Sequence, residues 1–142
     1  MKKVSDILNR KGSYVESVKP ETIVIDALKL MADKNIGSVA VVHNDIFVGL
    51  MTERDYSRKI ILKGRASNET TVGEIMTSNG PSVTRNDSVE NCMEIMSSKN
   101  LRYLPVIENN KLIGIISIND VVTETIFTQK ETIEHLQNYI HS

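Results

Sequence analysis

The sequence contains little of what several classes of protein require. A single cysteine, Cys92, occurs in 142 residues, which excludes an internal disulfide framework and fits a reducing compartment. The formal net charge is only -1, so no strong field favours nucleic acid or an anionic membrane. No apolar run approaches the roughly 18 residues of a membrane span, and no apolar stretch follows Met1-Lys2-Lys3 as a secretory signal needs. We therefore expect a soluble, cytoplasmic protein without a nucleic-acid or membrane partner.

The usual catalytic patterns are also missing. His43, His135 and His141 lie in a predicted turn and in the tail, without metal-ligand spacing or a pairing with Ser or Cys. Gly12 and Gly80 read as turn residues, because neither the Walker pattern nor Gly-x-Gly-x-x-Gly occurs. An enzyme for nucleotide hydrolysis or NAD-linked redox chemistry needs a paired acid and base or a metal cluster, and we find neither. We expect no metal, no catalytic cofactor and no enzymatic activity.

What the sequence does contain is an internal repeat. Residues 18–55 align without a gap on residues 83–120 when the chain is shifted by 65 positions. The identical pairs include Lys34-Asn35 with Lys99-Asn100 and Gly49 with Gly114. A repeat of this length is too long for a solenoid unit and predicts a two-fold pseudo-symmetric module. We place the first repeat at residues 1–66, the second at 67–128 and a helical extension at 129–142.

Each copy predicts a short lead-in helix, a short strand, a helix, two strands and a final helix. Apolar residues recur at helical spacing from Val24 and from Val89, and we expect Asp87 to cap the second of these helices. Apolar runs then flank tight turns around residues 43–45 and 108–111, where Asn and Asp tolerate left-handed conformations. The lead-in helices lie near residues 4–8 and 72–76, and the short strands near 15–18 and 81–83. The fold class is therefore α/β (α+β), with a small sheet and two helices in each repeat.

Both copies end in the same polar pattern, Gly-x-x-Thr/Ser-x-x-Asp. It comprises Gly49, Thr52 and Asp55 in the first copy, and Gly114, Ser117 and Asp120 in the second. A Gly allows close backbone approach, and Thr or Ser is a good N-cap for helices starting at residues 53 and 118. The helix start favours anions, and an Asp one turn on can accept hydrogen bonds from a vicinal diol. The pattern predicts a ribose-phosphate site, to which Arg54 and Arg102 can add phosphate charge.

These residues are where the chain resembles a known family. The doubled motif, placed after a helix and a hairpin, resembles a tandem pair of CBS (cystathionine β-synthase) domains, also called a Bateman module. The resemblance runs from about residue 4 to residue 128. It is closest to small stand-alone CBS-pair proteins of bacteria, in the segments at residues 51–56 and 101–106.

The resemblance implies a non-catalytic regulatory module that binds an adenine nucleotide (AMP, ADP, ATP or NAD) in clefts between two repeats. The implied partners are a second copy of the chain, in a homodimer, and an unidentified effector protein. One implied nucleotide-binding set is Ser13, Val15, Ser17, Arg102, Tyr103, Ser117, Asn119 and Asp120. The other is Thr52, Arg54, Asp55, Thr77, Ser82 and Val83. Because Arg102 and Tyr103 align with Gly37 and Ser38, we expect unequal sites, with tighter phosphate binding at Asp120.

Simpler interpretations stay open for these features. Thr52 and Ser117 can be N-caps alone, and the Asp residues can merely favour the helix dipole. The whole chain can be a ligand-independent dimeric scaffold. An apolar stripe toward the C-terminus can serve a subunit contact or dock on its own domain. Cys92, which aligns with Ala27, reads as a small core residue rather than a nucleophile.

Overall fold

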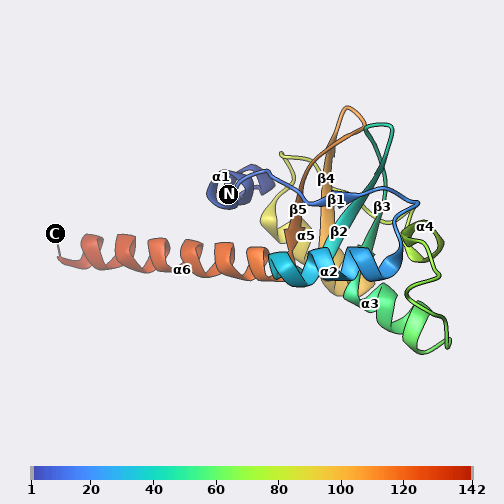
Figure 1. The fold of residues 1–142 in the computed structure, drawn as a ribbon. Coiled ribbons are helices and arrows are strands. Elements are labelled where there is room, and N and C mark those ends of the chain that lie inside the picture. Colours follow the sequence, from blue (N-terminus) through green and yellow to red (C-terminus); the bar gives the residue numbers. More distant parts are fainter. Residues whose placement is uncertain (1, 142) are drawn as a thin grey trace. The chain divides into compact units, whose positions relative to one another are not determined.

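The computed structural model describes residues 2–141, whose fold is drawn in Figure 1. The chain divides into two compact units. Unit 1 comprises Met1–Ser13, Pro81–Glu108 and Gly114–Ser142, and unit 2 comprises Tyr14–Gly80 and Asn109–Ile113. Helices and two small sheets are combined, which confirms the predicted α/β (α+β) class. No helix within residues 2–141 is long and apolar enough to cross a membrane.

Unit 2 is built on a three-stranded sheet in the order β1-β2-β3. β1 (Ser17–Val18) pairs parallel to β2 (Ser38–His43), which pairs antiparallel to β3 (Ile46–Thr52). Helix α2 (Val24–Lys34), α3 (Glu53–Tyr56), a π-helical turn η1 (Ser57–Ile61) and α4 (Val72–Ile75) complete the unit. The core of unit 2 consists of Val24, Ala27, Met31, Val39, Val41, Met51, Ile60, Val72 and Ile75. Apolar side chains at helical spacing on α2 therefore cover the sheet, as the periodicity predicted.

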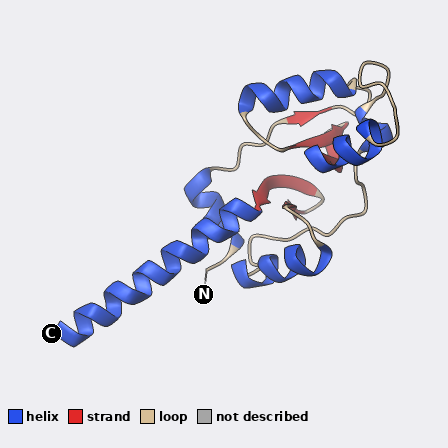
Figure 2. Cartoon of the chain, turned by 90° about the horizontal axis from the view of Figure 1, so that it is seen from below, coloured by secondary structure: helices blue, strands red, loops and turns tan. Residues whose placement is uncertain are grey.

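Unit 1 repeats this plan with a smaller sheet. β4 (Tyr103–Glu108) and β5 (Lys111–Ser117) form a two-stranded sheet, and Val83 adds a parallel bridge to Val106. The helices are α1 (Val4–Lys11), α5 (Val89–Lys99) and α6 (Ile118–His141). Figure 2 distinguishes these helices from the short sheets. The bridge at Val83 occupies the place that Val18 has beside Val41 in unit 2, so the repeat extends to strand pairing.

Asparagine and aspartate hold the tight turns. Asn44-Asp45 and Asn109-Asn110 all have positive φ, between 50° and 63°, as two-residue hairpin turns require. Asn35 and Asn100 end α2 and α5 with the same left-handed geometry, φ 53° and ψ 49°. Apart from glycine, asparagine and aspartate tolerate this left-handed conformation best. The same Asn therefore occurs in both copies because the backbone there needs a positive φ.

The lead-in helices are exchanged between the copies. The backbone N–H of Val4 donates to Asp87 O, and that of Val89 donates to Lys2 O, so α1 joins the second copy in unit 1. The matching pair joins α4 to the first copy in unit 2, because Val72 N donates to Thr22 O and Val24 N donates to Thr70 O. The spatial units therefore do not follow the boundary near residue 66 that separates the repeats along the chain.

Two local details differ from the sequence expectations. The N-cap of α5 is Ser88, whose Oγ accepts from Asn91 N at 3.0 Å, so the cap lies one residue after Asp87. Asp87 instead accepts from Thr84 N at 2.7 Å and stabilises the preceding turn. The helix after Thr52 is not uniform, because α3 passes into the π-helical turn η1 before Gly64. α6 begins at Ile118 as predicted and continues without interruption to His141.

Candidate functional site

In unit 2 the motif lies where β3 passes into α3. Thr52 is the last residue of β3 and caps α3, because its Oγ1 accepts from Asp55 N at 3.1 Å. The carboxylate returns the bond: Asp55 Oδ2 accepts from Thr52 N at 3.0 Å and from Thr52 Oγ1 at 3.1 Å. This reciprocal arrangement is a capping box, which satisfies helix donors that otherwise lack partners.

The second oxygen of Asp55 is also engaged. Asp55 Oδ1 accepts from Thr77 Oγ1 at 2.9 Å and lies 3.1 Å from Lys59 Nζ, which also donates to Ile75 O at 2.8 Å. Only 9% of the Asp55 side chain is exposed. Oδ1 thus joins α3 to the segment after α4, and Oδ2 closes the capping box with Thr52, so both carboxylate oxygens stabilise the fold of unit 2.

In unit 1 the motif lies where β5 passes into α6. Asp120 N donates to Ser117 Oγ at 3.1 Å, and Ser117 N donates to Asp120 Oδ2 at 2.7 Å, so the capping box recurs. Lys11, from the end of α1, donates to the same Asp120 Oδ2 at 2.7 Å and to Ile115 O at 2.9 Å. The Asp120 side chain is 21% exposed, more than twice the value for Asp55.

The two motifs therefore differ in how much of the carboxylate the protein uses. Described bonds reach both oxygens of Asp55, whereas those of Asp120 converge on Oδ2. A carboxylate oxygen can accept two hydrogen bonds, so Oδ1 of Asp120 can accept a hydroxyl from a ligand. Lys11 adds a positive charge beside it, which the other motif receives from Lys59 on its own helix.

Both motif glycines lie in close contact with other protein atoms and do not face open solvent. A Cβ at Gly49 would lie 2.8 Å from Thr77 O and 3.0 Å from Met76 Sδ. A Cβ at Gly114 would lie 2.7 Å from Leu8 Cδ2. The lead-in segment of each unit thus presses against the second strand of its hairpin, and the glycine makes room for it.

Each predicted binding set draws residues from both units. Ser117, Asn119, Asp120, Arg102, Tyr103 and Ser13 belong to unit 1, whereas Val15 and Ser17 belong to unit 2. Thr52, Arg54, Asp55 and Thr77 belong to unit 2, whereas Ser82 and Val83 belong to unit 1. Within a unit the structure brings the motif residues together.

Some of the other predicted residues are placed by bonds within their own unit. Thr77 touches Asp55, and Arg102 O accepts from Ile118 N at 2.8 Å beside the start of α6. The Arg102 side chain is exposed. Ser17 instead lines an open hollow of about 620 Å³ with the turn at residues 42–45, a lining without motif residues.

Lys11 and Lys59 are site residues that the sequence interpretation missed. Lys59 follows Asp55 by one helical turn, a spacing that signals an ion pair. Lys11 carries no such signal, because it meets Asp120 only through the exchange of the lead-in helices.

Other chemistry is limited in this part of the molecule. Within residues 2–141, no three His, Cys, Asp or Glu side chains group closely enough to hold a metal ion. Cys92 is fully buried, and burial, with the nearby charge of Asp87, raises the pKa of its thiol to about 11. The thiol is a core group rather than a nucleophile, because only a thiolate attacks efficiently.

Comparison with known proteins defines the class. The CBS domain profile matches residues 4–62 and 72–125, which covers both copies of the motif. The chain belongs to the CBS domain family, as a tandem pair, and proteins of this class are regulatory modules.

Three relatives illustrate the similarity. A CBS-domain protein of Burkholderia ambifaria, assigned to signal transduction, shares 43% identity and a TM-score of 0.85, over 89% of this chain and 96% of that chain. The mitochondrial CBS domain-containing protein CBSX3 of Arabidopsis thaliana is 36% identical over 96% of this chain and 71% of its own length. A hexameric CBS-CP12 protein of bloom-forming cyanobacteria shares 28% identity and a TM-score of 0.75, over 84% of this chain and 66% of that chain. The predicted family is confirmed.

Proposed function

We propose that this CBS pair is a non-catalytic sensor that binds an adenine nucleotide at the Asp120 motif and regulates a partner protein. The observation that supports this best is the junction of β5 and α6. There a capped helix start, the Ser117 hydroxyl, the Lys11 ammonium group and a partly exposed Asp120 carboxylate lie together. A ribose diol needs an acceptor, and a phosphate needs donors and positive charge.

The chemistry divides between these groups. Asp120 Oδ1 accepts the ribose hydroxyls while Oδ2 keeps its bonds to Ser117 N and Lys11. The ammonium group of Lys11 has three donors, of which two are used by Ile115 O and Asp120. The third donor and the exposed guanidinium of Arg102 serve phosphate oxygens.

Asp55 is a weaker candidate for the same role. Its two oxygens already bind Thr52, Thr77 and Lys59, and a ligand diol must displace one of them. Breaking a bond to a buried carboxylate costs more than the net value of a new hydrogen bond. We therefore propose one nucleotide per chain, in agreement with the unequal sites expected from the sequence.

Regulation follows from population shift. A nucleotide that binds one arrangement of the protein better than another raises the population of that arrangement, and a partner protein reads the change. Self-association is consistent with the hexameric relative, and we propose a homodimer as the basic assembly.

The test is calorimetric titration of AMP, ADP, ATP and NADH into protein that has been unfolded and refolded to remove carried-over ligand. At a ligand concentration of about 100 times Kd, binding stabilises the folded state by roughly 2.7 kcal/mol, a readily measured rise in Tm. Asp120→Asn should weaken binding at least tenfold. Asp87→Asn is the matched control, because Asp87 also accepts a backbone N–H in unit 1 but lies outside the motif.

Absence of heat and of a Tm shift with all four nucleotides would overturn the proposal and favour the scaffold. Equal loss of affinity in Asp120→Asn and Asp87→Asn would show that the motif carboxylate does not hold the ligand. Loss in Asp55→Asn alone would move the site to unit 2.

A further inference from the structure

α6 carries an apolar stripe on the face that its own unit does not use. Along this stripe the spacing alternates between four and three residues. The members are Val122, Ile126, Gln129, Ile133, Leu136 and Ile140. The apolar ones are between 46% and 74% exposed. A strict alternation of this kind is a heptad repeat, with Ile126, Ile133 and Ile140 at a positions and Val122, Gln129 and Leu136 at d positions.

The opposite face of α6 is the one that packs on unit 1. Val121 and Glu124 are 0% and 1% exposed, and Thr125 and Thr128 are half-buried. Glu124 pairs with Arg10 of α1 at 3.2 Å. These residues occupy the c, f and g positions, so the heptad stripe points away from the body that anchors the helix. Of the two roles that the sequence left open for the stripe, the structure does not show docking on its own unit, because the apolar side chains of the stripe are exposed.

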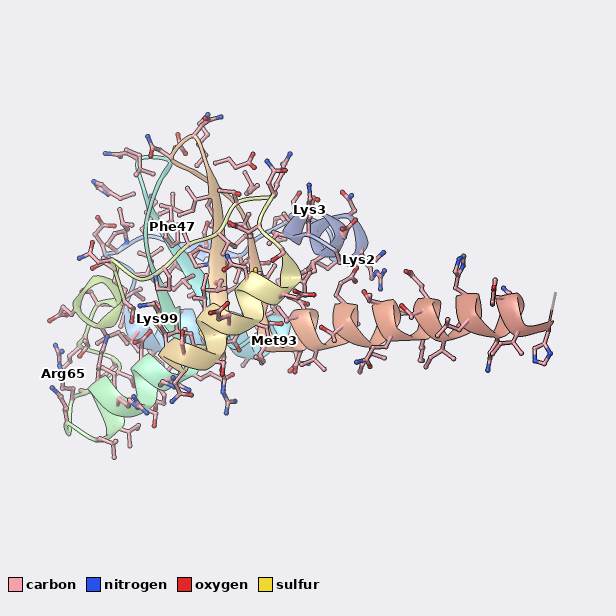
Figure 3. The ribbon with its side chains drawn as sticks, turned by 180° about the vertical axis from the view of Figure 1, so that it is seen from behind. Lys2, Lys3, Phe47, Arg65, Met93 and Lys99 are labelled. Atoms are coloured by element: carbon pink, nitrogen blue, oxygen red, sulfur yellow. The ribbon has the colours of Figure 1, made fainter. Side chains whose placement is uncertain are left out.

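The described residues in the second half of α6 are not buried against their own unit. Side chains project from α6 on both sides over this half (Figure 3), and every described residue from 129 to 141 is exposed. Isolated helices shorter than about 12–15 residues are marginal in water, so a segment of this length gains its stability from packing on another element.

We propose that the stripe on α6 binds the same stripe of a second copy of this chain, forming a parallel two-stranded coiled coil over residues 122–140. Ile at every a position with Leu at a d position favours a parallel dimer. Gln129 supports a like partner, because its amide donates to and accepts from the same amide across the pair and so fixes the register.

Charge agrees with this orientation. In the parallel pair the flanking g and e positions join Thr125 to Lys130 and Thr132 to Gln137, without a like-charged contact. In an antiparallel pair with the same apolar layers, the centre falls at residue 131 and brings the two Lys130 side chains together. The polar face carries Glu131 and Glu134 against the single Lys130, which disfavours an anionic lipid surface.

The area is sufficient for a specific contact. From the exposed fractions of the five apolar members, pairing removes roughly 1,000 Å² of apolar surface over the two chains, at the lower limit for a biological interface. The interface uses no residue of the proposed nucleotide site, so nucleotide binding and the coiled coil fail or hold independently.

Cysteine crosslinking tests both partner and orientation. The background is Cys92→Ala in the full chain, since Ala27 fills the matching position in the other copy. Leu136→Cys places a thiol at a d position, and the matched control Asn138→Cys places one at an f position two residues away. Under mild oxidation with glutathione at about 10 μM protein, we expect the Leu136→Cys dimer to form at least tenfold faster than the Asn138→Cys dimer.

Three further outcomes decide the matter. Adding Ile133→Asp should reduce crosslinking of Leu136→Cys to the control rate while the circular dichroism of the units persists, because the residue is exposed. Equal rates for Leu136→Cys and Asn138→Cys in the purified protein would overturn the coiled coil, whether or not another protein uses the stripe. Preferential crosslinking in a mixture of Ile126→Cys and Leu136→Cys chains, without self-crosslinking of Leu136→Cys, would overturn the parallel orientation.

Discussion

Replacing Gly49 with alanine tests the packing of the lead-in segment on β3. An ordinary strand glycine gains roughly 0.5–1 kcal/mol on replacement by alanine, because glycine loses more backbone freedom on folding. At Gly49 the new Cβ lies 2.8 Å from Thr77 O and 3.0 Å from Met76 Sδ. The nearer atom belongs to the backbone, so it cannot move by a side-chain rotation.

The cost follows from what must shift. Leu50 N donates to Thr77 O at 3.0 Å, and Thr77 N donates to Leu50 O at 2.8 Å, so moving Thr77 weakens both bonds of this bridge. Each is worth about 1 kcal/mol, and overpacking costs about 1–3 kcal/mol, so we expect a net loss near 2 kcal/mol. At Gly114 the contact is Leu8 Cδ2, at 2.7 Å, the end of a side chain that can rotate. We expect about 1 kcal/mol or less there.

Urea denaturation followed by circular dichroism measures the difference. Gly80→Ala is the control, because its Cβ would meet only Thr77 Cγ2 at an ordinary 3.8 Å. The expected order of destabilisation is Gly49→Ala, then Gly114→Ala, then Gly80→Ala near zero. A Gly114→Ala cost equal to or above that of Gly49→Ala would refute the reasoning that backbone and side-chain contacts differ in how far they can yield.

Further changes test the buried charges and the thiol. Arg10→Met should lower the free energy of unfolding, measured by urea denaturation, by about 2 kcal/mol, because it leaves the Glu124 carboxylate buried without its counter-charge. Adding Glu124→Gln should recover at least half of this loss, and no recovery would contradict the explanation. Asp55→Asn should lower the free energy of unfolding by about 2 kcal/mol more than Asp120→Asn does, since both oxygens of Asp55 accept bonds within the protein. Equal losses in the two variants would refute that ranking. Cys92 should react with iodoacetamide at pH 8 at least about 100-fold more slowly than free cysteine. Folding raises the pKa of Cys92 from 9.0 to about 11, so the contribution of the neutral thiol to stability is complete below pH 9 and is lost as the pH rises toward 11. The Tm of the unmodified protein should therefore fall more between pH 9 and pH 11 than the Tm of Cys92→Ala.

Local signals predicted the elements that are governed by neighbouring residues. The hairpin turns follow from Asn44-Asp45 and Asn109-Asn110, whose left-handed φ any strand pair of this kind requires. The caps at Thr52 and Ser117 follow from a hydroxyl three residues before an acid. The cap of α5 was misplaced by one residue because Asp87 and Ser88 are both good caps, and the choice depends on the turn that Asp87 closes with Thr84.

Contacts between segments far apart in the chain could not be predicted from the sequence. The pairing of Lys11 with Asp120 spans 109 positions and depends on α1 joining the second copy rather than its own. Likewise, the motif sequence does not distinguish Asp55, whose two carboxylate oxygens both accept bonds, from Asp120, whose bonds fall on Oδ2. That distinction comes from Thr77 and Lys59, which belong to a different segment and to the helix after the motif.

The exchange of lead-in helices has a consequence for synthesis on the ribosome. A chain made from its N-terminus completes residues 14–80, the main segment of unit 2, as one continuous stretch that already includes α4 and its core residues Val72 and Ile75. α1 is made earlier but has no partner until α5 and α6 follow. Its apolar residues Val4, Ile7 and Leu8, all buried in the folded protein, lack their partners until α5 and α6 have been made. Unit 1 therefore closes after the main segment of unit 2 has been made, and the Lys11–Asp120 contact forms only once residue 120 has been made.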